Sequence, residues 1–408
     1  MMETLTIERV GAQGDGVAKG EIGPVFVPFT LPGERVNCAV KGGDGAAMAI
    51  LAPSPDRIEP VCKHFEHCGG CTSQHWAAAP YLAWKRELLI EALASKSIEA
   101  EVRPAIACQP GGRRRVTFTA RKVHDKIMIG FNAARSHDIV EILECPVSMP
   151  SLIAALPALK RLASILVTKN DPARLSATQT VSGLDIAVDG VPAPKGEARK
   201  RASEYTILNK WARLSVAGEI IVEPRKPVLS FGRVPVFLAP GGFLQAVQNV
   251  EEAMAALVCS HLATSKKVAD LFAGAGSFTF RLAEKSAVHA VESDAGSVAA
   301  LDHAWKNVQG LKPISAEKRD LFRRPLMPFD LKAYDGVVFD PPRAGAEAQC
   351  AVLAKSNVRR VAAVSCNPVT LARDLRILID GGYKLLSVTP FDQFLWSPHV
   401  EAVALLEK

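Results

Sequence analysis

Two residues near the C-terminus have types and positions suited to covalent catalysis. Cys366 follows the apolar stretch VAAVS and precedes Asn367 and Pro368, which end a strand sharply and can expose the sulfur. A thiolate there can add to carbon 6 of a uracil ring, which makes carbon 5 electron-rich enough to attack an electrophilic methyl group. Glu401, flanked by apolar residues in PHVEAVALLEK, can serve as the base that then removes a proton from carbon 5.

A glycine-rich turn predicts a site for an adenosine-containing ligand. In VADLFAGAGS an apolar strand runs into a turn where Gly274 and Gly276 let the backbone pass close to a ligand. Glu292 ends the next strand, 18 residues after Gly274, where its carboxylate can accept hydrogen bonds from ribose hydroxyls. A nicotinamide dinucleotide site would need a third glycine where the chain has Thr279, so a ligand without pyrophosphate is favoured. Two further carboxylates follow later strands, Asp320 in KRDLF and Asp340 in VVFDPPR.

Three cysteines within ten residues predict a metal centre. The stretch VCKHFEHCGGC carries them with Cys-x5-Cys-x2-Cys spacing, and its Gly-Gly pair lets the thiolates converge. A fourth thiolate is present in LECPVSMP, where the following proline is typical of cluster-binding cysteines. Four thiolates suit either a tetrahedral zinc ion or an iron–sulfur cluster, and nearby histidines keep zinc open. The candidate ligands are Cys62, Cys68, Cys71 and Cys145, and the histidines are His64, His67 and His75.

The patterns along the chain place these residues in three units. Residues 1–56 alternate short apolar runs with glycine turns, which predicts about five strands and a small RNA-binding barrel, a shape often used to hold single-stranded nucleic acid. Helical spacing of apolar residues predicts a helix over 81–93, and 113–145 returns to strand-like alternation. From about residue 236, strands alternate with helices as in a parallel α/β sheet, which binds ligands at the carboxyl ends of its strands. The expected domains are a β-barrel (1–59), a central α+β domain that carries the cysteines (60–235) and a Rossmann-like α/β domain (236–408).

Composition and charge indicate a globular protein with a phosphate-bearing partner. With 48% hydrophobic and 22% charged residues and no run of 18 apolar residues, the chain offers no membrane span. Its start lacks the features of a secretion signal, and nine cysteines, an odd number, argue against a disulfide framework, so we expect a cytoplasmic protein and a monomer. The net charge of +7 is concentrated in residues 61–235, where 25 basic residues face 16 acidic ones. Such a basic segment suits nucleic acid.

The ordered motifs resemble the uridine-5 RNA methyltransferase family, the relatives of the bacterial 23S rRNA and tRNA uracil-5 methyltransferases. The first 56 residues resemble the family's TRAM barrel, and CKHFEHCGGCTSQHW resembles its iron–sulfur segment. DLFAGAGSFTF, FDPPRAG, SCNP and HVEAVALLE follow its catalytic motifs in order, so the resemblance covers nearly the whole chain. It implies S-adenosylmethionine as the methyl donor, a [4Fe-4S] cluster rather than zinc, and a structured RNA substrate. Because barrel and cluster occur together, 23S rRNA is favoured over tRNA.

The resemblance also implies a role for each candidate residue. Cys366 would be the nucleophile and Glu401 the base, and the cluster would bind Cys62, Cys68, Cys71 and Cys145. The cofactor contacts would come from Gln245, Phe272, Glu292, Asp320 and Asp340, with Phe243 in the same substrate-facing motif as Gln245. The basic run Arg113, Arg114, Arg115 and Arg121 would lie in the family's RNA-contacting region, where arginines grip phosphates or stack on bases.

Two departures from the family pattern keep more than one function open. Members usually carry asparagine at the positions of Ser277 and Val247. A serine can still donate and accept a hydrogen bond, so Ser277 remains a candidate cofactor contact, whereas Val247 receives no polar role. The departures are the only indication of a noncatalytic RNA-binding relative. A tRNA substrate also remains open, as does a methyltransferase that uses FDPPR to modify an amino group and needs neither Cys366 nor Glu401.

Overall fold

The structure is a computed structural model that describes residues 1–168 and 171–408. Its first unit is a small closed barrel. Its strands pair in the order β1-β2-β3-β5-β4, and alternate side chains such as Ile7, Val27 and Val36 fill the interior. The five strands and the barrel match the sequence prediction. The strands are β1 (Met2–Val10), β2 (Gly16–Lys19), β3 (Pro24–Val27), β4 (Arg35–Lys41) and β5 (Asp44–Ala52).

The second unit is a seven-stranded, mostly antiparallel sheet with the order β12-β11-β10-β9-β6-β7-β8. Apolar residues of three helices, including Leu152, Leu159 and Ala202, pack on sheet residues such as Phe118 and Leu175 to form its core. The strands are β6 (Arg115–Val123), β7 (Lys126–Asn132), β8 (Ile139–Val140), β9 (Ala173–Thr180), β10 (Gly183–Asp189), β11 (Arg213–Val216) and β12 (Glu219–Val222). The helices are α2 (Pro150–Ala154), α3 (Leu156–Leu166) and α4 (Gly196–Leu208), and a ribbon of β13 (Val228–Phe231) and β14 (Val234–Phe237) follows.

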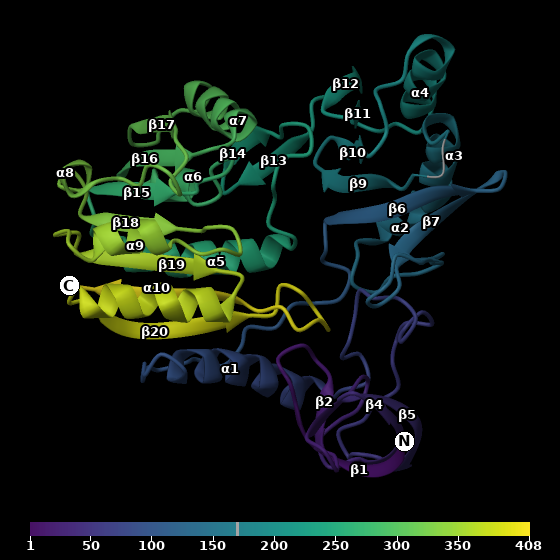
Figure 1. The fold of residues 1–408 in the computed structure, drawn as a ribbon. Helices are drawn as coiled ribbons and strands as arrows, with labels where there is room; N and C mark the ends of the chain where they lie inside the picture. The colour runs from purple at the N-terminus through teal and green to yellow at the C-terminus, as the bar shows by residue number, and fades with distance from the viewer. Residues whose placement is uncertain (169–170) are drawn as a thin grey trace.

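The third unit is the α/β sheet predicted for the C-terminal part, ordered β17-β16-β15-β18-β19-β21-β20 (Figure 1). Five strands run parallel, while β21 pairs antiparallel with both β19 and β20. Apolar side chains fill both faces, as expected for a sheet covered by helices. The strands are β15 (Lys267–Leu271), β16 (Ala287–Glu292), β17 (Ile314–Lys318), β18 (Gly336–Phe339), β19 (Arg360–Ser365), β20 (Lys384–Phe391) and β21 (Glu401–Glu407). The helices are α5 (Gln248–His261), α6 (Thr279–Leu282), α7 (Ala295–Lys306), α8 (Pro328–Leu331), α9 (Glu347–Leu353) and α10 (Pro368–Asp380).

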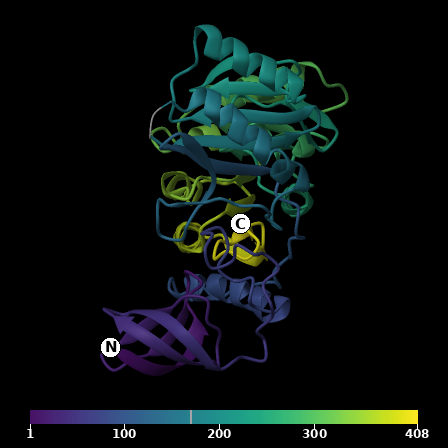
Figure 2. The same cartoon turned by 90° about the vertical axis from the view of Figure 1, so that its right-hand side faces the viewer.

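Helix α1 (Ala78–Ala94) joins the N-terminal half of the chain to this third sheet. Its residues Tyr81 and Trp84 share a hydrophobic core with Leu371 and Leu375 of α10. Figure 1 shows α1 alongside β20, and Figure 2 shows the barrel beyond it at one end of the molecule. The helix matches the prediction over 81–93, but it packs on the C-terminal sheet instead of the central one. Among the described residues, no helix has both the length and the apolar character needed to cross a membrane.

Candidate active site

One large cavity, of about 1800 Å³, opens where the three units meet. Its walls include the carboxyl ends of β15, β16, β18 and β19, the edge at which a parallel sheet binds ligands. The structure therefore gathers candidate residues that are up to 339 positions apart in the chain (62 to 401). Those that line the cavity are Cys62, His64, Cys68, Cys71, Arg113, Arg115, Cys145, Phe243, Gln245, Phe272, Gly274, Ser277, Glu292, Asp340, Cys366 and Glu401.

The turn after β15 forms the part of the cavity suited to an adenosine ligand. Phe272, Gly274 and Gly276 all have positive φ, at 58°, 55° and 99°, so the chain doubles back tightly beside the sheet. The Gly274 amide donates to Oε2 of Glu292 at 3.0 Å. Oε1 of Glu292 accepts from the amides of Ser293 and Asp294, which fixes the carboxylate at the end of β16. This is the position from which a carboxylate can contact a ribose.

Asp320 lies outside the cavity lining, but its neighbour Phe322 belongs to it. The Asp320 carboxylate accepts from the Phe322 amide at 2.9 Å and forms an ion pair with Arg323 at 3.6 Å. These contacts hold the Phe322 ring 5.5 Å from the ring of Phe272, measured between centroids. The two aromatic rings give the cavity an apolar wall. Sequence reasoning missed Phe322, although its place after a strand-end aspartate was a usable signal.

Cys366 stands between β19 and α10, half-buried at the cavity edge. Asn367 caps the helix, because its side-chain oxygen accepts from the amide of Val369 at 3.1 Å. Burial, followed by the nearby carboxylates of Glu401 and Asp340, raises the pKa of the Cys366 thiol to about 11, and Arg343 opposes this shift. The strand end therefore presents a thiol whose ionisation depends on the two carboxyl groups beside it.

A chain of buried amides connects those two carboxyl groups. Nε2 of Gln393 donates to Oε2 of Glu401 at 3.1 Å and to Oε1 of Gln245 at 2.8 Å. Nε2 of Gln245 in turn donates to Oδ2 of Asp340 at 2.8 Å. Burial raises the pKa of Asp340 to about 7, and burial together with Asp340 raises the pKa of Glu401 well above its ordinary value. Gln393 was not predicted, because its only sequence signal is a polar residue at the end of an apolar strand.

The four candidate cysteine ligands share one wall of the cavity. Burial first, and then the nearby thiols of Cys145, Cys68 and Cys62, raise the pKa of the Cys71 thiol to about 12, so the four groups lie near one another. Sγ of Cys145 accepts from Oγ of Ser148 at 3.2 Å. Within residues 1–168 and 171–408, no group of three or more His, Cys, Asp or Glu side chains is arranged to hold a metal ion. The four thiols therefore share a wall of the cavity, but the part of the chain that the structure describes does not itself show a metal centre there.

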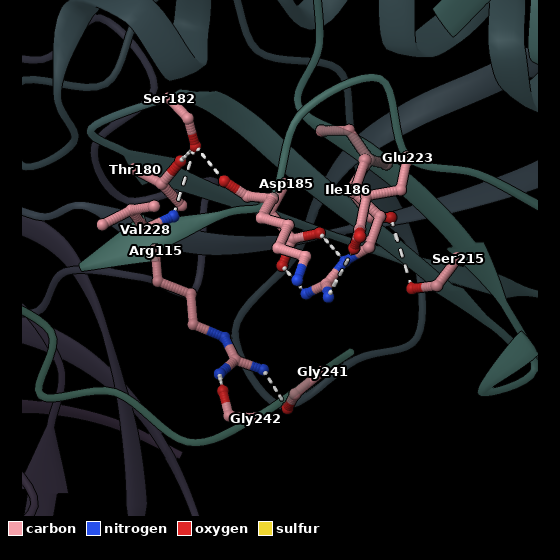
Figure 3. Close-up of polar contacts among 12 residues, drawn as sticks. Arg115, Thr180, Ser182, Asp185, Ile186, Ser215, Glu223, Val228, Gly241 and Gly242 are labelled. Carbon is pink, nitrogen blue, oxygen red and sulfur yellow. Dashed lines mark hydrogen bonds and ion pairs between the residues drawn. The ribbon is translucent and has the colours of Figure 1, made fainter. Parts of the chain in front are cut away.

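The arginine run is anchored by contacts within the chain, but Arg113 and Arg115 also line the cavity, so its contact with RNA stays a prediction. Arg114 is buried, pairs with Glu251 at 2.5 Å and donates to the Gln245 carbonyl at 3.1 Å. The other members are held as well: Arg115 donates to the carbonyls of Gly241 and Gly242 (Figure 3), Arg113 lies 5.8 Å from the Phe394 ring centroid, and Arg121 is half-buried on β6. The donors of Arg114 and Arg115 thus satisfy carbonyls and a buried carboxylate, whereas the buried Nε of Arg121 has no hydrogen-bond partner among the described residues.

The two departures from the family pattern have different surroundings. Val247 is the N-cap residue of α5 and is buried in the hydrophobic core of the third unit, without a side-chain hydrogen bond to the helix. This agrees with the apolar role expected for it. Ser277 lines the cavity in the turn after β15, and its carbonyl accepts from Nη1 of Arg281 at 2.5 Å. Only the serine is placed to meet a ligand.

The chain is similar over its full length to known RNA methyltransferases. A family model described as tRNA (uracil-5-)-methyltransferase matches residues 236–408. An uncharacterized RNA methyltransferase of Brucella suis is 55% identical, with 99% of this chain and 97% of that protein covered. A 23S rRNA (uracil(1939)-C(5))-methyltransferase of Dichelobacter nodosus is 31% identical, with 99% and 98% covered. The solved structure of a Pyrococcus abyssi tRNA (uracil-54, C5)-methyltransferase with S-adenosyl-L-homocysteine has a TM-score of 0.77 at 24% identity, covering 99% of both chains.

The parallel sheet, the cavity at its carboxyl edge and these similarities together define an enzyme of the methyltransferase class. The chain belongs to the uridine-5 RNA methyltransferase family, as its ordered motifs predicted. The likeness to the Pyrococcus abyssi structure shows that the fold is shared along the whole chain.

Proposed function

We propose that this enzyme transfers a methyl group from S-adenosylmethionine to carbon 5 of a uridine in 23S rRNA. The observation that carries the proposal is the convergence of Cys366, Asp340 and Glu401 at one cavity edge, where both carboxylates act on the thiol. A nucleophile and a base within one pocket are what substitution at carbon 5 requires. The 31% identical relative from Dichelobacter nodosus, whose name specifies 23S rRNA, supports this RNA over tRNA.

The cofactor would bind at the turn after β15. The Glu292 carboxylate is placed to accept from ribose hydroxyls, and Phe272 with Phe322 would cover the adenine. Asp340 and Gln245 would border the reacting end of the ligand, with Ser277 as a further polar contact. When bound, S-adenosylmethionine supplies an electrophilic methyl group on a sulfonium.

The residues then account for the reaction by addition and elimination. The Cys366 thiolate adds to carbon 6 of the uracil, and the displaced electron pair makes an enolate across carbons 5 and 4. Carbon 5 would take the methyl group that the bound cofactor supplies, and the electron pair of the broken carbon–sulfur bond would stay on the cofactor's sulfur. The Glu401 carboxylate removes the proton from carbon 5, the ring recovers its double bond, and the bond between sulfur and carbon 6 breaks. The raised pKa of Glu401 makes it a stronger base for that proton.

The cavity also constrains the form of the RNA. The target base must leave its stack to reach Cys366, so a loop or bulge is the expected substrate. At about 1800 Å³, the cavity has room for an extruded nucleotide beside the cofactor. The concentration of positive charge in residues 61–235 favours a polyanionic partner.

We further propose that Cys62, Cys68, Cys71 and Cys145 hold a [4Fe-4S] cluster, which is supported by their place on one cavity wall. When bound, the cluster would join the segment 62–71 to Cys145 through iron–thiolate bonds. Anaerobic purification followed by iron and sulfide analysis tests this: we expect about four of each per chain, and loss of both in the Cys68→Ser variant. Bound zinc with no sulfide would reject the cluster.

The test of the catalytic proposal is a covalent trap combined with RNA mapping. The wild type should form a denaturation-resistant complex with 5-fluorouridine RNA, whereas Cys366→Ala should form none and should lose methyl transfer. Cys259→Ala is the matched control, since the pKa of that half-buried thiol is also raised to about 11, but it lies outside the cavity. Mass mapping of rRNA and tRNA from cells with and without the protein identifies the substrate. Methyl transfer by Cys366→Ala would instead favour amino-group chemistry.

A further inference from the structure

The loop between β20 and β21 places the Gln393 side chain beside Glu401. Because Gln393 lies two residues beyond the end of β20, no strand pairing fixes its position. The loop covers residues 392–400, and six of its members line the cavity. Within it, Trp396 has a positive φ of 57°, a conformation that costs a non-glycine residue free energy unless contacts hold it. Many of the contacts that hold this loop come from a remote part of the chain, residues 72–85; others include a hydrogen bond from the Asp392 amide to the Ile106 carbonyl and one between Arg343 and His399.

Lys85 of α1 is the centre of these contacts. It is fully buried, and its ammonium group donates to Oδ1 of Asp392, to the Phe394 carbonyl at 3.1 Å and to the His399 carbonyl at 2.8 Å. An ammonium group has three N–H donors, and here each one meets an acceptor of the same loop. One side chain thus holds two residues at the start of the loop and one near its end.

Two further contacts reinforce the same anchor. The Tyr81 hydroxyl, one helical turn before Lys85, donates to Oδ1 of Asp392 at 2.9 Å and accepts from the Trp396 amide at 2.7 Å. The Trp396 carbonyl accepts from the amides of Thr72 and Ser73 at 2.7 and 3.2 Å. Both backbone groups of the strained residue are therefore satisfied from outside the loop.

A buried pair of this kind is poorly explained by stability alone. Taking a lysine and an aspartate out of water costs free energy that their attraction only partly returns, and apolar pairs often stabilise a protein as well. The pair instead fixes the position of Asp392, and through it the position of the neighbouring residue Gln393. Shifting Asp392 would move Gln393 away from Oε2 of Glu401 and Oε1 of Gln245, to which its amide donates.

We propose that Lys85 is a positioning residue: by holding Asp392 and the carbonyls of Phe394 and His399, it keeps Gln393 donating to Glu401. This inference rests on the proposed role of Glu401 as the base. Without Lys85, the Glu401 carboxylate loses its fixed orientation toward the cavity, and the step it serves slows. The cofactor site at Glu292 shares no contact with this anchor.

The Lys85→Met variant tests the proposal in the full-length protein. We expect kcat to fall at least tenfold with KM for RNA within about twofold, and methylated RNA to accumulate as a covalent complex on denaturing gels, because proton removal is slowed. Cofactor affinity, measured by calorimetry, should change much less than kcat, because the Glu292 contacts stay in place and only the bond from Gln393 to Gln245 is affected. The Tyr81→Phe variant removes a single hydroxyl and should show the same effects more weakly, which gives a result if Lys85→Met does not fold.

The matched control is Arg213→Met, which breaks another buried ion pair, between Arg213 and Asp185 at 2.8 Å in the central sheet. It should leave kcat and complex accumulation at wild-type levels. Wild-type kcat in folded Lys85→Met, or equal losses in the control, would overturn the positioning role. An absence of covalent complex in the wild type with 5-fluorouridine RNA would instead reject the proposed function itself, so the two failures are distinguishable.

Discussion

Cys366 is held in its protonated form by burial and by the same carboxyl groups that we propose to serve the reaction. Burial and the carboxylates of Glu401 and Asp340 raise the pKa of its thiol to about 11. The thiolate is therefore scarce at neutral pH in the free enzyme, and its fraction rises as pH increases toward that value. A substrate that neutralises or displaces a carboxylate charge would favour the thiolate at the moment it is needed.

Asp340→Asn tests this link at the level of one residue. Removing the negative charge removes a contribution that raises the pKa of Cys366, so the pKa falls and alkylation of Cys366 by iodoacetamide at pH 8 becomes faster. A decrease of one in the pKa should raise the rate about threefold, because the gain in thiolate exceeds the loss in nucleophilicity. Peptide mass spectrometry measures the rate at this cysteine.

The control for that experiment is an aspartate at the other end of β18. Asp335 precedes β18, whereas Asp340 follows it, and the Asp335 carboxylate accepts from the amides of Lys266 and Lys267. Asp335→Asn thus removes one carboxylate from the opposite end of β18 and should leave the alkylation rate unchanged. An unchanged rate in Asp340→Asn would show that this carboxylate does not control the thiol.

At the scale of elements, two glycines in the turn after β15 have different roles: one is needed for packing and the other leaves space for a ligand. A Cβ on Gly276 would come 2.6 Å from Cε2 of Phe280, which is buried in the core, and the φ of 99° is itself unfavourable for other residues. A Cβ on Gly274 would meet no protein atom within 4 Å. Packing therefore requires Gly276, whereas Gly274 leaves space at the cavity.

We therefore expect opposite results from two alanine substitutions. Gly276→Ala should lower the free energy of unfolding by at least about 2 kcal/mol, through strain and the clash with Phe280. Gly274→Ala should cost only the strain of its backbone conformation, about 1 kcal/mol, but weaken cofactor binding at least tenfold, because the methyl group points into ligand space. Urea unfolding and calorimetry measure the two effects. Equal cofactor affinity in Gly274→Ala and wild type would contradict this assignment.

The start of α5 offers a second prediction for an element. Val247 occupies the N-cap position but contributes only apolar packing, whereas asparagine there would accept from an amide of the first turn. In Val247→Asn, lost apolar burial should lower the free energy of unfolding by about 1–3 kcal/mol, and the new cap should restore about 1 kcal/mol. Val247→Ala should lose apolar packing without gaining a cap. Stability in urea should therefore decrease from wild type to Asn to Ala. An Asn variant less stable than Ala would show that no cap forms.

At the scale of the whole molecule, the active site exists only because three units meet. The cavity takes walls from the barrel, the cysteine segment, the central sheet and the C-terminal sheet. Charge is divided unequally among these parts: residues 1–60 carry 5 basic and 8 acidic residues, whereas residues 61–235 carry 25 and 16. The barrel is therefore a poor electrostatic partner for phosphate, and the middle of the chain is a good one.

This charge distribution predicts that the affinity for RNA depends on salt concentration, whereas the affinity for the cofactor does not. Binding of transcribed 23S rRNA should weaken by at least roughly tenfold between 50 and 200 mM KCl, because phosphate contacts release counterions. Cofactor affinity should change little over the same range, since the proposed site presents a glycine turn, aromatic rings and the carboxylates of Glu292 and Asp340, and the ligand carries no phosphate. Filter binding and calorimetry provide the two measurements. RNA affinity independent of salt would indicate that stacking, and not phosphate contact, dominates.

The sequence alone determined the features that depend on neighbouring residues. Period-two alternation with glycine turns predicted five strands and a barrel, and helical spacing predicted the helix that the structure has over Ala78–Ala94. The alternation of strands and helices after residue 236 predicted the α/β sheet, and so placed Cys366 and Asp340 at strand ends on one edge. These patterns are local, because backbone geometry fixes which side chains share a face.

Only the tertiary structure decided which polar groups meet. Arg114 was expected at the RNA, but its partner Glu251 lies 137 positions away, and Lys85 reaches Asp392 across 307 positions. No periodicity encodes such a pairing, since it depends on how separately formed layers pack. A buried donor must find an acceptor wherever packing places one, so the support of the proposed base became visible only when α1 was seen against the C-terminal sheet.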